Sequence, residues 1–155
     1  MAEYICPSPM GPLTLVEENG ALVALRFNPG LPRDAAAFAL PSTPLLRQAA
    51  AELAAYFAGE LKAFTVPLAP KGTPFQRKVW QALREIPYGE TRSYKELAAA
   101  VGNEKACRAV GLANNRNPLP IFIPCHRVIG ANGKLVGYAG GLDVKTFLLE
   151  LEKRK

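Results

Sequence analysis

The sequence predicts an α/β protein of the α+β type, with a small sheet-and-helix domain followed by a mostly helical domain. Three observations support this class: a β-hairpin pattern near the N-terminus, capped amphipathic helices after it, and a boundary rich in proline and glycine at residues 67–74, "PLAPKGTP". We therefore expect domains at residues 1–70 and 71–155. A chain of 155 residues with 49% hydrophobic side chains can bury a substantial core.

The first domain begins with two apolar runs, residues 13–17 and 21–27. Asn19-Gly20 lies between them and is a strong signal for a tight hairpin turn. Pro44 suits the first turn of a helix ending near Gly59, which carries apolar residues at helical spacing: Leu45, Leu46, Ala49, Leu53, Tyr56 and Phe57. Residues 64–66 could add a further strand.

The second domain opens with Thr73-Pro74, an N-cap and first-turn pair for a helix extending through residue 86. Ser93 and Glu96 form a capping box for a helix to residue 101, and Asn103 can cap another helix over residues 104–115. Two short helices joined by a tight turn match a helix-turn-helix, whose second helix docks on DNA. Two packed core helices without a DNA role are the alternative interpretation.

Residues 119–125, "LPIFIPC", form an apolar run that Pro120 and Pro124 interrupt, so we expect buried but irregular backbone. Asp143 can cap a final helix whose inner face carries Phe147, Leu148 and Leu151.

The basic charge of the chain belongs to its second half. Residues 71–155 hold 15 Lys and Arg against 7 Asp and Glu, a net +8, whereas residues 1–70 hold 4 against 6, a net −2. This distribution fits a nucleic-acid face or a merely solvated basic surface. No apolar run approaches the roughly 20 residues that cross a bilayer, and no secretory signal is evident, so we expect no membrane partner and a cytoplasmic location.

The cysteine and histidine counts argue against a metal site. Cys6, Cys107 and Cys125 include no C-x-x-C pair, and His126 is the single histidine. Neither a disulfide framework nor a zinc site is indicated. We expect no metal and no cofactor.

Cys125 and His126 are adjacent in the stretch "IPCHRVIG", residues 123–130. Successive side chains of a regular strand point to opposite faces, so the backbone must bend if the pair is to exchange a proton. Pro124 favours such a bend. A nearby imidazole and flanking basic groups would activate the thiol, and Asp143, Glu150 or Glu152 could orient the imidazole.

The order of these residues resembles the O6-alkylguanine-DNA alkyltransferases, also called methylated-DNA–protein-cysteine methyltransferases, in their bacterial form. The resemblance rests on Pro-Cys-His-Arg at residues 124–127, Asn117-Pro118 upstream, "RAVGLANNRNPLPI" before it, and "GYAGG" with a terminal helix after it. It covers most of residues 72–152. By layout it also implies a ribonuclease H-like first domain and a winged-helix-like second one.

The resemblance implies a direct-reversal DNA repair enzyme that acts once per molecule on double-stranded DNA. Cys125 would accept the alkyl group of flipped O6-alkylguanine, and also of O4-methylthymine. His126 would take the thiol proton through water, with Glu152 orienting the imidazole and Asn117 bracing the turn. The implied substrate contacts are Tyr94, Val128, Tyr138, Ala139 and Asn114, the last at a position that is apolar in some members.

For DNA, the resemblance implies that Arg108 fills the gap left by the flipped base and that Tyr94 contacts a phosphate. The further DNA contacts would be Lys95, Asn103, Ala106, Cys107 and Gly111, although for Cys107 alone a small packed thiol is the favoured explanation. The implied oligomeric state is a monomer that can cluster on DNA.

The rivals are a lesion-binding module without transfer, a helix-turn-helix redox regulator and a cysteine hydrolase. Cys125 argues against the first of these because such modules usually carry tryptophan at this position.

Overall fold

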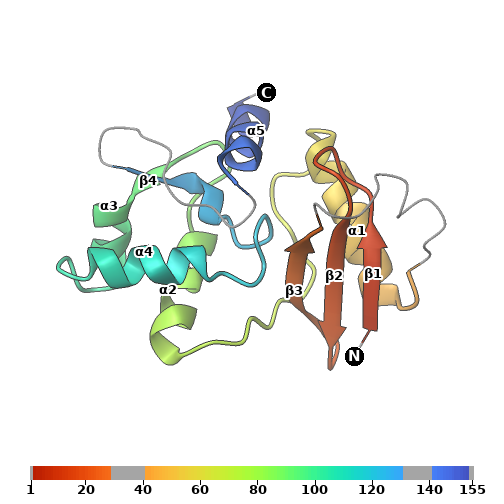
Figure 1. The fold of residues 1–155 in the computed structure, drawn as a ribbon, viewed down its shortest axis with the longest axis horizontal. Helices are drawn as coiled ribbons and strands as arrows, with labels where there is room; N and C mark the ends of the chain where they lie inside the picture. Colours follow the sequence, from red (N-terminus) through yellow and green to blue (C-terminus); the bar gives the residue numbers. More distant parts are fainter. Residues whose placement is uncertain (1, 29–40, 131–140, 154–155) are drawn as a thin grey trace. The chain divides into compact units, whose positions relative to one another are not determined.

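The computed structural model describes residues 2–28, 41–130 and 141–153 (Figure 1). The chain divides into two compact units, Met1–Pro70 and Lys71–Lys155. In the described ranges, no helix is long and apolar enough to cross a membrane.

The first unit contains a three-stranded antiparallel sheet of β1 (Ala2–Cys6), β2 (Leu13–Glu18) and β3 (Ala21–Phe27), in that order. The predicted hairpin is confirmed: Leu15 pairs with Leu25, and Asn19 and Gly20 both have positive φ, 52° and 79°. A two-residue turn of this kind matches the twist of the strands it joins. The edge strand β1 was not predicted, because residues 2–6 lack a clear alternation of apolar and polar side chains.

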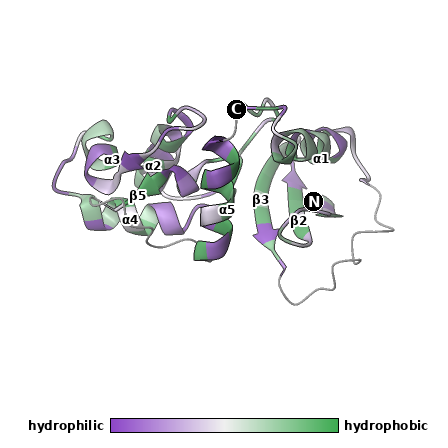
Figure 2. Cartoon of the chain, turned by 90° about the horizontal axis from the view of Figure 1, so that it is seen from above, coloured by the Kyte–Doolittle hydropathy of each residue, from purple (hydrophilic) through white to green (hydrophobic). Residues whose placement is uncertain are grey.

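The helix α1 (Pro44–Phe57) packs against this sheet. Thr43 caps it by accepting a hydrogen bond from the Leu46 amide, and its buried face consists of Leu46, Ala49, Leu53 and Tyr56. Figure 2 shows hydrophobic residues along β2 and β3.

The strand expected at residues 64–66 is wrong. The chain instead makes one isolated parallel bridge between Leu22 and Leu68, in which the Leu22 amide donates to Pro67 O and Ala69 donates to Leu22 O. Pro67 has no amide hydrogen, so a ladder cannot extend through it.

In the second unit, α2 (Pro74–Arg84) and α3 (Tyr94–Ala100) both begin with the predicted capping residues. Thr73 with Gln76, and Ser93 with Glu96, each exchange two hydrogen bonds. The helix α4 (Cys107–Asn115) packs on both. Trp80 is buried between α2 and α4, and its Nε1–H donates to Ala113 O at 2.8 Å.

The predicted start of α4 is wrong by three residues. Its N-cap is Ala106, whereas Asn103 closes a turn ahead of the helix: Asn103 Oδ1 accepts from the Lys105 amide, and Asn103 O accepts from Ala106. A short asparagine side chain readily makes such a local turn, which competes with helix capping.

The rest of the unit consists of an irregular segment, a 3₁₀ turn at Cys125–Arg127, β5 (Val128–Ile129) and α5 (Leu142–Lys153). β5 pairs in parallel with β4 (Arg92–Ser93). Asp143 lies in the first turn of α5 and does not precede it as a cap, since the helix already begins at Leu142.

The inner face of α5 also differs from the prediction, because Phe147 is 37% exposed while Leu148 and Leu151 are buried. Figure 2 shows that α5 mixes hydrophobic and hydrophilic residues along its length.

Candidate active site

Cys125 and His126 lie in a 3₁₀ turn, so the alternation of a strand does not apply to them. The turn is closed by hydrogen bonds from Cys125 N to Ile123 O (2.7 Å) and from Arg127 N to Pro124 O (3.0 Å). Both side chains are buried, Cys125 with 3% and His126 with 0% of its surface exposed. The bend expected at Pro124 is therefore present, and it presents the two neighbours within one buried region.

Asn117 braces the segment that leads to the cysteine. Its Nδ2 donates to Ile123 O at 2.8 Å, and its Oδ1 accepts from the Leu119 amide at 2.9 Å. Between these contacts Ile121 has a positive φ of 76°, which is rare for a β-branched residue. Such a conformation persists only where the surrounding structure stabilises it, and the two Asn117 hydrogen bonds contribute to that stabilisation.

Glu152 is the carboxylate that reaches the histidine. His126 Nε2 lies 2.7 Å from Glu152 Oε2. Arg127 holds the same carboxylate with both ends of its guanidinium, Nε to Oε1 at 2.8 Å and Nη2 to Oε2 at 3.0 Å. The Gly89 amide adds a contact to Oε1 at 3.3 Å, and Arg127 Nη1 donates to Ile86 O at 2.6 Å.

This network fixes the protonation of the carboxylate and the imidazole. Burial alone would raise the pKa of Glu152, but hydrogen bonds from His126 and Arg127, and the positive charge of Arg127, lower it to about 2. Burial lowers the pKa of His126, against the opposing effect of Glu152. A neutral imidazole beside an ionised carboxylate carries its hydrogen on Nε2. His126 Nδ1 is then an acceptor, and it has no hydrogen-bond partner within the part of the chain that the structure describes.

Burial raises the pKa of the Cys125 thiol to about 11, while a hydrogen bond from Asn117 and the positive charge of Lys145 act in the opposite direction. Lys145 has none of its surface exposed, and its Nζ donates to Val128 O at 2.7 Å. Lys145 was not predicted as a site residue. Its signal was available, since it lies three residues before Leu148 and seven before Glu152, on the buried face of α5.

Of the predicted substrate contacts, Tyr94 and Asn114 lie beside the cysteine. Asn114 Nδ2 is 3.5 Å from Cys125 O, and its side chain also hydrogen-bonds Tyr94. Burial and the nearby Cys125 raise the pKa of Tyr94. Val128 O is the carbonyl that Lys145 contacts. Tyr138 and Ala139 lie outside the described residues.

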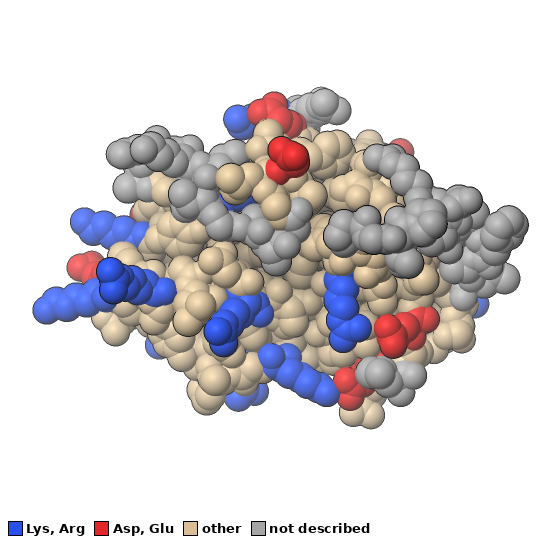
Figure 3. Space-filling model, viewed as in Figure 1, with Lys and Arg blue, Asp and Glu red and all other residues tan. Residues whose placement is uncertain are grey.

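The predicted DNA contacts lie along α3 and α4. Arg108 and Lys95 are exposed, and Gly111 packs close to the Tyr94 ring: a Cβ at Gly111 would lie 3.8 Å from it. Asn103, Ala106 and Cys107 lie at the turn before α4 and at its start. Figure 3 shows Lys and Arg side chains over the α3 and α4 side of this unit.

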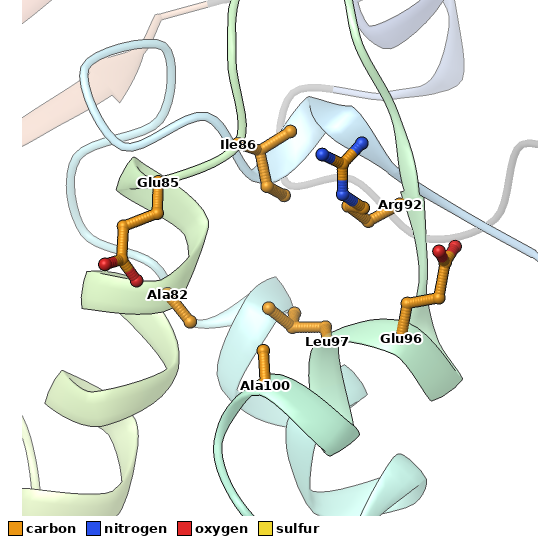
Figure 4. A pocket seen from close by; sticks show the side chains of 7 residues that line it. All are labelled: Ala82, Glu85, Ile86, Arg92, Glu96, Leu97 and Ala100. Carbon is orange, nitrogen blue, oxygen red and sulfur yellow. The ribbon is translucent and has the colours of Figure 1, made fainter.

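A separate hollow of about 280 Å³ lies between α2 and α3 (Figure 4). Its wall is formed by Ala82, Glu85, Ile86, Arg92, Glu96, Leu97 and Ala100, and none of these was predicted as a site residue. Across the ranges described, no cluster of three or more His, Cys, Asp or Glu could hold a metal ion.

The similarity to known proteins extends over nearly the whole chain. Two family models match: the 6-O-methylguanine DNA methyltransferase ribonuclease-like domain over residues 1–70 and the DNA binding domain of the same family over residues 74–154. A methylated-DNA–protein-cysteine methyltransferase of Methanosarcina acetivorans is 56% identical over 149 residues, 96% of each chain. The constitutive enzyme of Bacillus subtilis is 63% identical over 112 residues, 72% of this chain and 68% of that protein.

Among solved structures, Mycobacterium tuberculosis OGT in complex with DNA matches with a TM-score of 0.86 and 51% identity, covering 97% of this chain and 92% of that one. Matched over both of its units, this chain belongs to the 6-O-methylguanine DNA methyltransferase family.

Proposed function

We propose that this protein repairs DNA by moving the alkyl group of O6-alkylguanine irreversibly onto Cys125. The observation that carries the proposal is the buried Cys125 turn, with a neutral histidine beside it and an ionised carboxylate behind the histidine. Membership of the methyltransferase family supports the reaction type. O4-methylthymine is a further proposed substrate.

In this proposal, His126 takes the thiol proton through one water. Nε2 is engaged with Glu152, so the proton must arrive at Nδ1, the buried acceptor on the other side of the ring. Arg127 already compensates the charge of Glu152. The carboxylate can therefore stabilise the imidazolium as it forms without protonating the resting imidazole.

The thiolate then attacks the alkyl carbon in line with the C–O6 bond. A thioether forms on Cys125, the O6–carbon bond breaks, and its electron pair stays on the guanine, which takes up a proton to become ordinary guanine. The Asn117 hydrogen bond and the Lys145 charge favour the thiolate against its burial. No group in this scheme removes the alkyl from sulfur, so each molecule acts once.

The lesion lies inside a base stack, so the nucleotide has to be flipped out at a cost of a few kcal/mol. We assign Arg108 to the vacated space, because it is an exposed cation in the first turn of α4. Tyr94, Lys95, Asn103, Ala106, Cys107 and Gly111 would line the approach of the minor groove and its phosphates. Val128, Tyr138 and Ala139 would complete the base pocket.

The test is to incubate the protein with duplex DNA containing O6-methylguanine and to measure the mass of tryptic peptide 117–127. This peptide contains Cys125 and neither of the other cysteines. We expect a gain of one methylene group, reaching one equivalent per molecule, and none in Cys125→Ser. An unmodified peptide, with the protein bound to an intact lesion, would instead support a binding module without transfer.

A further inference from the structure

The loop that follows α2 contacts the buried ion pair of the site at three points. The carbonyl oxygen of Ile86 accepts a hydrogen bond from Arg127 Nη1 at 2.6 Å, and the centroid of the Tyr88 ring lies 5.7 Å from Arg127 Cζ. The Gly89 amide donates to Glu152 Oε1 across 3.3 Å. A guanidinium within about 6 Å of a ring centroid is in the range of a cation–π interaction. The loop therefore contacts both members of the ion pair, although none of its residues has a part in the proposed reaction.

Gly89 allows the loop to approach the end of α5 closely. The loop is a β-turn closed by a hydrogen bond from Glu90 N to Pro87 O at 3.1 Å, and Gly89 has a φ of 81°. A type II turn requires a positive φ at its third residue, which favours glycine there. A Cβ at Gly89 would also lie 3.2 Å from Glu152 O. A larger residue would therefore push the turn away from the helix that carries the carboxylate.

The half-buried Tyr88 ring limits the access of water to the Arg127 guanidinium, which is the charge that compensates Glu152. The charged groups that act on His126 are Arg127 of its own turn and Glu152 and Lys145 of α5. Burial is the largest cause of the lowered pKa of His126; Arg127 and Lys145 lower it further, whereas Glu152 raises it. If Arg127 moves away or becomes solvated, Glu152 attracts a proton to the imidazole more strongly.

We propose that Tyr88 and Gly89 are positioning residues, which hold Arg127 and Glu152 together so that His126 stays neutral and its Nδ1 can accept the proton of the thiol. Tyr88 acts through Arg127, and Gly89 acts through Glu152. This inference rests on the proposed function and adds to it the loop that keeps the proton acceptor ready.

The first test compares Tyr88→Leu, which removes the ring, with Tyr88→Phe, which keeps it. Without the ring, the pKa of His126 should rise. A pKa at the ordinary 6.5 leaves roughly a quarter of the molecules with a neutral imidazole at pH 6 and nearly all of them at pH 8. In single-turnover reactions with a duplex containing O6-methylguanine, we expect Tyr88→Leu to be about threefold to fourfold slower than the wild type at pH 6 and nearly equal to it at pH 8. Tyr88→Phe should match the wild type at both pH values.

The protonation of His126 can be measured directly, because it is the single histidine of the chain. Nitrogen NMR of the imidazole over a pH series, without DNA, gives its pKa and shows which ring nitrogen carries the hydrogen. We expect the wild type and Tyr88→Phe to be neutral at pH 6 with the hydrogen on Nε2, and Tyr88→Leu to be partly protonated. A variant that merely loosens the fold would slow transfer equally at pH 6 and pH 8, and that result would overturn the proposal.

Gly89→Ala tests the turn independently, with Gly102→Ala as its matched control. Gly102, after α3 in the same unit, has a φ of 86°, so alanine meets a similar backbone strain there. A Cβ at Gly102 would lie 4.0 Å from Lys78 Nζ, whereas the one at Gly89 would press on Glu152 O. We expect Gly89→Ala to raise the pKa of His126 in the NMR titration and Gly102→Ala to leave it unchanged.

The outcomes separate this inference from the proposed function. A wild type that takes no methyl group from O6-methylguanine overturns the proposed function. A wild type that does so, while Tyr88→Leu and Gly89→Ala leave the titration of His126 unchanged, overturns the positioning role alone. If one of the two variants does not fold, the other decides the question.

Discussion

Replacing Glu152 with glutamine tests the network behind the imidazole, because it keeps the shape of the side chain and removes its charge. In the wild type, Glu152 contacts His126 and Arg127 with almost all of its surface buried. Glutamine cannot pair with the guanidinium as an ion, so a buried arginine loses its counter-charge. We expect Glu152→Gln to be less stable than the wild type at neutral pH.

The magnitude follows from the pKa of Glu152. A fall from the ordinary 4.5 to about 2 corresponds to about 3 kcal/mol of stability at neutral pH. In the unfolded chain Glu152 takes up its proton near the ordinary pKa of 4.5, which is a higher pH than in the folded chain. Acid therefore favours unfolding, and this contribution is lost as the pH falls from about 4.5 towards 2. A protonated glutamic acid resembles glutamine, so the difference between wild type and variant should shrink over the same range.

The assay is urea denaturation followed by tryptophan fluorescence, at neutral pH and in steps through the acid range. Trp80 is the one tryptophan of the chain and is buried in the second unit, so its emission reports on the unit that holds the network. Glu150→Gln is the matched control, since Glu150 lies on the same helix with its side chain 62% exposed. A stability difference for Glu152→Gln that is independent of pH would refute the assigned ion pair.

Two further predictions concern the thiol of Cys125 and the DNA contact proposed for Arg108. Lys145→Met should slow methyl transfer at neutral pH by about tenfold or more, because the nearby positive charge lowers the pKa of Cys125 and such a charge changes a pKa by about 1 to 3. The rate should recover at higher pH. Lys153→Met, at an exposed position of α5, is the control. Arg108→Ala should slow repair of duplex DNA while leaving the reaction with O6-methylguanine as a free base unchanged. Equal slowing of both reactions would show that Arg108 does not act in flipping.

Local signals predicted most of the helices because each signal involves residues only a few positions apart. Thr73-Pro74 is an N-cap and first-turn pair, Ser93 with Glu96 is a capping box, and Asn19-Gly20 is a complete turn. The helix start predicted from Asn103 was wrong for a related reason. Its side chain could serve a helix or a turn, and the sequence does not show which competing hydrogen bond is formed.

The site is formed by contacts between residues that lie far apart in the sequence. Sequence spacing alone could not decide which of the candidate residues meet. Asp143, Glu150 and Glu152 were equal candidates for orienting His126 until the resemblance favoured the last. In the structure Glu152 reaches the imidazole, whereas Asp143 lies in the first turn of α5 and Glu150 is exposed. Lys145 was missed because a lysine is ordinarily placed on a solvated face.

The side chains around the turn determine the protonation states of the adjacent Cys125 and His126. A 3₁₀ turn alone would leave a buried thiol with a raised pKa beside an imidazole that burial keeps neutral, which is an inert pair. Asn117 and Lys145 favour the thiolate, whereas Glu152 favours the imidazolium. Arg127 prevents that carboxylate from protonating the histidine in advance. Asn117, Lys145 and Glu152 each oppose the effect of burial, whereas Arg127 acts together with burial on the imidazole, so the reaction proposed for the pair depends on all four side chains.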